Sequence, residues 1–157
     1  MSEYSAELYV HAIAIEREAA ERYAELARAM FAQGNHAVAA LFGMLASVEG
    51  RHLDELRRRT AGLSLPALNA DYTWHGDAPE TVAVEGALTR EGALGMALQA
   101  EKRARAFFEH ASRVAQDAET RELAREMAAE EAEHAALIER MIERGPRGET
   151  DWRSAAR

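Results

Sequence analysis

The chain has 157 residues, no cysteine, and 27 acidic against 19 basic side chains, which gives a formal net charge of −8. This length fits one domain with its own apolar core. The absence of thiols excludes disulfides, thiolate metal sites, a catalytic cysteine and cysteine-ligated electron-transfer centres within these residues. The basic residues are scattered among acidic ones and form no stripe that could follow a phosphate backbone, so nucleic acid is not an expected partner.

The composition predicts an all-α fold, because Ala, Glu, Arg and Leu are abundant and aromatic residues make up only 6% of the chain. The N-terminal stretch MSEYSAELYVHAIAIERE lacks the basic start and the unbroken apolar run of a signal peptide. No segment approaches the ~20 apolar residues that span a bilayer. We therefore expect a cytoplasmic protein without a membrane partner.

Two helices are predicted in the first part of the chain. Apolar periodicity extends from about Ser5 to Phe31 and resumes from about His36 to Arg59, and Gly34 and Asn35 interrupt it. A break this short predicts an antiparallel helix hairpin. Residues 60–88 hold two of the three prolines together with Gly, Asn and Asp, which predicts a connector.

A second pair of helices follows the connector. The third is predicted from the N-cap Thr89 to about Ala115 and the fourth from a break at Gln116-Asp117 to about Arg144, where Gly145-Pro146 ends it. A connector longer than ~12 residues needs a reason, and a crossover along the bundle supplies one. The prediction is a ferritin-like four-helix bundle of two antiparallel hairpins joined by a long crossover. The bundle would take residues 1–145, and residues 146–157 would form a polar C-terminal tail.

Each predicted helix carries charged residues in its core-facing stripe, found by steps of three and four. The first stripe reads Ala12, Glu16, Ala19, Tyr23, Leu26, Met30, and the third reads Ala97, Glu101, Ala104, Phe108, Ala111, Ala115. The second reads Val38, Phe42, Leu45, Glu49, His52, Leu56, and the fourth reads Ala124, Met127, Glu131, His134, Ile138. One Glu thus interrupts each of the first and third stripes, and a Glu-x-x-His pair interrupts each of the second and fourth.

The two halves of the chain form an internal repeat. AIAIEREAAERY resembles ALQAEKRARAFF at an offset of 85 residues (Glu16 to Glu101), and LASVEGRHLDEL resembles MAAEEAEHAALI at an offset of 82 (Glu49 to Glu131). The charged positions lie about 15 to 18 residues from each hairpin turn, so a rise of ~1.5 Å per residue places them level. We expect them to converge inside the bundle, whereas the neighbouring glutamates Glu18, Glu21, Glu130 and Glu133 should face solvent.

A cluster of four carboxylates in an apolar core is costly, because the charges repel one another and lose their hydration. Two divalent cations would neutralise it. Carboxylate oxygens and imidazole nitrogens suit iron or manganese, and also zinc without redox chemistry. The sequence therefore predicts a two-metal site. Its expected ligands are Glu16, Glu49, His52, Glu101, Glu131 and His134. The alternative without metal is a polar layer whose side chains are hydrogen-bonded or ion-paired within the bundle.

The motifs AIAIEREAAERY, VEGRH, ALQAEKRARAFF and EEAEH resemble those of rubrerythrin-type di-iron proteins of the ferritin-like superfamily, over residues 8 to 142. The resemblance implies two iron ions. It implies that Glu16 and Glu101 are terminal ligands, that Glu49 and Glu131 bridge the metals, and that each histidine binds one metal. Tyr23 could hydrogen-bond to a ligand. Rubrerythrins carry a further Glu one turn after the third-helix ligand, where this chain has Ala104.

The resemblance further implies a non-haem di-iron oxidoreductase that reacts with peroxide or dioxygen, with a role in oxidative stress. Because the chain has no cysteine, its electrons would come from an external donor, and a homodimer is the expected assembly. Two other functions stay open. One is iron storage or ferroxidation in a ferritin-like shell, and the other is a di-iron oxygenase or hydroxylase with an organic substrate.

Overall fold

The computed structural model describes residues 3–67 and 88–146 and contains four helices within them. They are α1 (Glu3–Ala32), α2 (His36–Arg59), α3 (Arg90–Val114) and α4 (Ala118–Arg144). These bounds confirm the all-α prediction and agree with the predicted ends to within a few residues. Among the described residues, no helix is both long enough and apolar enough to cross a membrane.

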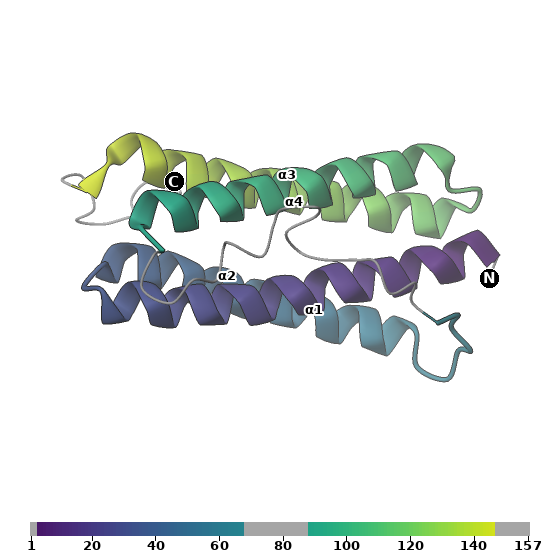
Figure 1. Ribbon diagram of the computed structural model, residues 1–157. Helices are drawn as coiled ribbons and strands as arrows, with labels where there is room; N and C mark the ends of the chain where they lie inside the picture. The colour runs from purple at the N-terminus through teal and green to yellow at the C-terminus, as the bar shows by residue number, and fades with distance from the viewer. Residues whose placement is uncertain (1–2, 68–87, 147–157) are drawn as a thin grey trace.

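The helices form two antiparallel hairpins lying side by side (Figure 1). α1 pairs with α2 and α3 pairs with α4, and between the hairpins the backbones of α1 and α3 come closest. α2 and α3 run in the same direction, so the end of α2 and the start of α3 lie at opposite ends of the bundle (Figure 1). This confirms the ferritin-like topology. Most of the predicted connector, residues 68–87, and residues 147–157 of the predicted tail lie outside the described part of the chain.

Local signals in the sequence explain where the helices begin and end. The side chain of Thr89 accepts a hydrogen bond from the backbone N–H of Gly92, and that of Asp117 accepts one from the backbone N–H of Thr120. Each satisfies an amide that has no partner inside the helix. At the first hairpin turn Gly34 has φ of 81°, a left-handed conformation that a side chain would disfavour.

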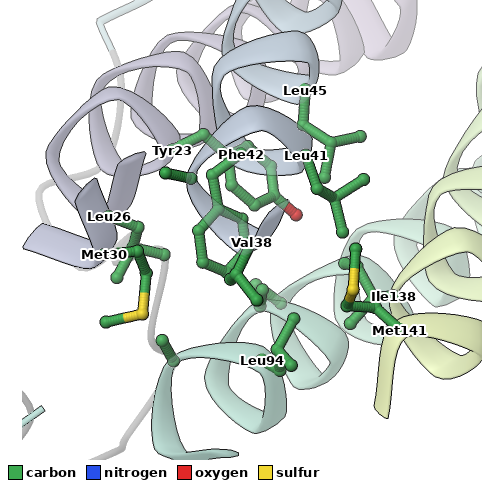
Figure 2. Close-up of a cluster of buried hydrophobic side chains, with 14 of the residues drawn as sticks. Tyr23, Leu26, Met30, Val38, Leu41, Phe42, Leu45, Leu94, Ile138 and Met141 are labelled. Atoms are coloured by element: carbon green, nitrogen blue, oxygen red, sulfur yellow. The ribbon is translucent and has the colours of Figure 1, made fainter. Parts of the chain in front are cut away.

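The described apolar core has two larger parts separated along the bundle, and a small third cluster of Leu8, Ala111 and Ala124 adjoins one of them through Phe107. One surrounds the end that holds the α1–α2 turn and includes Met30, Val38 and Phe42, which pack with residues of the second hairpin (Figure 2). The other lies toward the opposite end and includes Tyr9 and Phe108. On every helix, the predicted charged positions fall between these two parts. The core therefore encloses the charged layer from both ends.

Candidate metal centre

The six predicted ligand residues meet in the charged layer between the two apolar clusters. The four carboxyl-bearing residues are almost fully buried, with relative exposures of 0% for Glu16, 1% for Glu49, 3% for Glu101 and 3% for Glu131. The side chain of His134 is 8% exposed and that of His52 is 20% exposed. The stripe positions that sequence periodicity assigned to the core therefore all face inward.

The six residues form two groups of four, and each group could hold one metal ion. The first contains Glu16, Glu49, His52 and Glu131, and the second contains Glu49, Glu101, Glu131 and His134. Within each group, one donor atom per residue lies within 4.8 Å of all the others. Glu49 and Glu131 belong to both groups, so the two positions adjoin and share these carboxylates.

The inner polar atoms of the cluster lack hydrogen-bond partners among the described residues. They include both carboxylate oxygens of Glu16 and of Glu49 and the Nδ1 atoms of both histidines. His134 Nδ1 lies 2.9 Å from Glu49 Oε1, yet the two atoms are not aligned as a hydrogen bond. Buried polar groups are nearly always satisfied, so this many orphaned donor atoms facing one another need an explanation. Cations between them would supply it, and the oxygen and nitrogen donors present fit a dimetal centre.

Without metal, the cluster must retain protons. Burial, reinforced by the neighbouring carboxylates, raises the pKa values of Glu16 and Glu131 well above the ordinary range. Burial opposes the charging of both imidazoles, but surrounding carboxylates outweigh it and raise the pKa to about 12 for His52 and about 10 for His134. Burial alone would raise the pKa of Glu49, but contacts with Glu16 and the two imidazoles outweigh burial and lower this pKa below its ordinary value. Protons thus balance the charge that metal ions would balance.

Tyr23 contacts the centre as the sequence suggested. It is fully buried, and its hydroxyl donates a hydrogen bond to Glu101 Oε1. Its ring lies 5.7 Å from that of Phe42, within the apolar cluster drawn in Figure 2. Burial and the adjacent Glu101 carboxylate raise the pKa of the phenol well above its usual value, so the hydroxyl keeps its hydrogen for this contact.

Sequence reasoning missed one contact of the centre. Glu130 was expected on the solvated surface, and its side chain is indeed 44% exposed, but Glu130 Oε2 lies 2.8 Å from His52 Nε2. The contact joins α4 to α2, so no spacing within one helix reveals it. The only hint in the sequence is the acidic pair Glu130-Glu131 before His134.

The other histidines in the described residues take no part in the cluster. His11 packs on Phe107, and His36 meets Phe31 edge to face. His110 is exposed on α3. Ala104, at the place of the additional rubrerythrin glutamate, is 8% exposed and belongs to the apolar cluster with Phe108, so no seventh donor enters from this position.

Comparisons with known proteins agree with this architecture. The rubrerythrin family model matches residues 92–155. A solved structure of an uncharacterized conserved protein from Magnetospirillum magnetotacticum MS-1 is 38% identical and superposes with a TM-score of 0.82. That alignment covers 90% of this chain and 95% of the other. No curated protein matches the chain. On the family match and this similarity, the chain belongs to the rubrerythrin family of the ferritin-like superfamily.

Proposed function

We propose that the protein is a non-haem di-iron oxidoreductase that reduces hydrogen peroxide or dioxygen, in the manner of rubrerythrins. The observation that carries the proposal is the pair of adjoining four-residue donor groups that share Glu49 and Glu131. Two metal positions with common carboxylates suit chemistry in which two electrons leave together. When bound, a pair of iron ions supplies one electron each to the oxidant.

The ligand roles follow from membership of the two groups. Glu16 and His52 belong only to the first group, so we assign them to one ion, and Glu101 and His134 belong only to the second, so we assign them to the other. The shared residues Glu49 and Glu131 would bridge the ions. Manganese and zinc suit the same donors, and iron is proposed because the family is a di-iron one.

The protein contributes an enclosed polar layer. The apolar clusters on both sides limit water around the centre and strengthen electrostatic interactions within it. Tyr23 holds Glu101 in place through its hydroxyl hydrogen. Reduction of hydrogen peroxide to two water molecules consumes two electrons and two protons. Because the chain has no cysteine to ligate an electron-transfer centre, we propose an external electron donor.

Iron loading and peroxide turnover test the proposal together. Purified protein is loaded with ferrous iron under argon, desalted, and assayed for iron per chain and for peroxide consumption with a chemical reductant. We expect about two iron ions per chain, the capacity of a ferritin-like dimetal site. The double variant His52→Ala/His134→Ala should lose both iron and turnover. His110→Ala removes an exposed histidine outside the cluster and should leave both unchanged.

Three results would redirect or overturn the assignment. Tens of iron ions per chain after exposure to air would indicate iron storage. Turnover of an organic substrate, with peroxide consumed only in its presence, would indicate an oxygenase. Iron content near zero in the wild type would overturn the dimetal centre itself.

We also propose that the protein forms a homodimer, which sedimentation equilibrium of the same sample would test.

A further inference from the structure

The imidazole of His52 is held at its outer nitrogen. His52 Nε2 lies 2.8 Å from Glu130 Oε2, while Nδ1 faces inward, 3.5 Å from Glu16 Oε2 and 3.4 Å from Glu49 Oε2. The inner atom has no hydrogen-bond partner. When Nε2 donates its hydrogen to Glu130, the neutral ring leaves a lone pair on Nδ1. That lone pair faces the donor group to which His52 belongs.

The side of the centre at His52 is the more open one. A pocket of about 80 Å³ lies there, lined by residues of α2 and α4 that include His52, Leu123, Met127 and Glu130. The side chain of His52 is 20% exposed, against 8% for His134. Because packing encloses this ring less completely, a directed contact is needed to fix its orientation.

The internal repeat indicates that a contact like that between Glu130 and His52 exists in only one half of the centre. The offset of 82 residues that relates Glu49 to Glu131 relates Val48 to Glu130. Valine has no hydrogen-bonding atom in its side chain, so it cannot hold an imidazole nitrogen. The two metal positions therefore have equivalent ligands but differ in the residue at this repeat position.

We propose that Glu130 is a positioning residue for His52, and that it supports metal binding at only one of the two positions, that of Glu16, Glu49, His52 and Glu131. The inference rests on the dimetal site proposed above. A carboxylate that accepts the outer N–H of a ligating histidine fixes the tautomer and orientation of the ring, and its loss typically weakens metal binding by about 10- to 100-fold.

The test is a calorimetric titration of the full metal-free chain with Zn²⁺, a diamagnetic probe. For the wild type we expect about two ions per chain. Glu130→Val, which installs the residue of the other repeat, should weaken one binding event by about 10- to 100-fold and leave the other within about twofold. Glu130→Gln removes the charge but keeps an acceptor oxygen, and should restore most of the lost affinity. Glu133→Val, at an exposed position of α4, serves as the matched control.

Nuclear magnetic resonance of the histidine rings supplies a second measurement. In the Zn²⁺-loaded wild type and in the Glu133→Val variant, the His52 Nε2–H should be protected from exchange with water. It should lose protection in the Glu130→Val variant.

Several outcomes would overturn the inference. Equal weakening of both events would indicate a general effect of charge or folding, and failure of the Gln variant to recover would indicate charge alone. If the Glu130→Val variant bound two Zn²⁺ ions with wild-type affinity, the positioning role would be overturned and the dimetal site would stand. A wild type that binds no Zn²⁺ would overturn both.

Discussion

Replacement of Glu16 by glutamine should stabilise the metal-free protein. Glu16 is 0% exposed, and neither of its carboxylate oxygens has a hydrogen-bond partner among the described residues. Burial and then the adjacent Glu49 carboxylate raise its pKa well above the ordinary value. Glutamine keeps the shape and offers an amide N–H toward Glu49, but it carries no charge that must be desolvated or neutralised.

The expected gain is about 1 to 3 kcal/mol in the free energy of unfolding, of the same order as the ~1–4 kcal/mol gained when buried ion pairs are replaced by apolar residues. Each kcal/mol corresponds to about 2–4 °C in Tm for a chain of this size.

The gain should grow with pH. Because the folded-state pKa of Glu16 is raised, the folded metal-free chain holds a proton that the unfolded chain releases above the model value of 4.5. The wild type therefore loses stability as pH rises through and beyond that value, whereas glutamine does not titrate. The difference between the two proteins should be small near about pH 5 and largest near about pH 8.

Guanidinium unfolding of chelator-treated protein, followed by circular dichroism at several pH values, measures this difference. Glu133→Gln changes an exposed glutamate on α4 and should stay within about 0.5 kcal/mol of the wild type. Saturating Zn²⁺ should reverse the order, because ligand binding stabilises the protein with the stronger site. A pH-independent gain, or a loss at every pH, would refute the claim that burying this carboxyl group is costly.

Three further predictions concern Tyr23, the two cluster histidines and Arg90. Tyr23→Phe removes the donor to Glu101 and should destabilise the Zn²⁺-loaded protein by about 1–3 kcal/mol in thermal unfolding; a change below about 0.5 kcal/mol would contradict the role of the hydroxyl. The metal-free wild type should lose stability as pH rises above 6.5, because folded His52 and His134 have pKa values of about 12 and about 10 and keep protons that the unfolded chain releases. Each retained proton adds a slope of about 1.4 kcal/mol per pH unit to that of the buried carboxyl groups, so a denaturant-unfolding profile no steeper above pH 6.5 than below it would contradict charged imidazoles. Arg90→Met removes a buried donor, 2.8 Å from a backbone carbonyl in the last turn of α4, and should cost about 1–3 kcal/mol while metal stoichiometry stays at the wild-type value.

Periodicity within single helices was sufficient to predict the fold and to select the residues that converge. A glutamate in an otherwise apolar stripe, such as Glu16 or Glu101, is visible in the sequence because helical spacing determines which face a residue occupies. Hairpin turns then fix the heights of facing residues, since each residue adds ~1.5 Å along the axis. These two rules need no knowledge of how the hairpins are rotated against each other.

The contact between Glu130 and His52 depends on that rotation, which is why sequence reasoning assigned Glu130 to solvent. The two residues lie on different hairpins, and the carboxylate reaches the ring from a position that is 44% exposed. A surface glutamate one residue before a buried one gives only a weak hint in the sequence, because acidic pairs are common on helix surfaces. The unequal exposure of the two histidines has the same origin, because it reflects how tightly α2 and α4 pack around each ring.

The repeat also explains why the two halves of the centre should not behave alike. The offset that relates Glu16 to Glu101 relates Tyr23 to Phe108, and both aromatic residues are fully buried. Tyr23 donates a hydrogen bond to Glu101, whereas a phenylalanine has no hydroxyl to offer Glu16. In the half with Glu101 and His134, the Glu101 carboxylate is restrained by Tyr23 and packing encloses the imidazole. In the half with Glu16 and His52, the imidazole is restrained by Glu130 and lies beside a pocket. Under the function proposed above, we therefore expect a small oxidant to reach the centre from the more open half, beside the pocket.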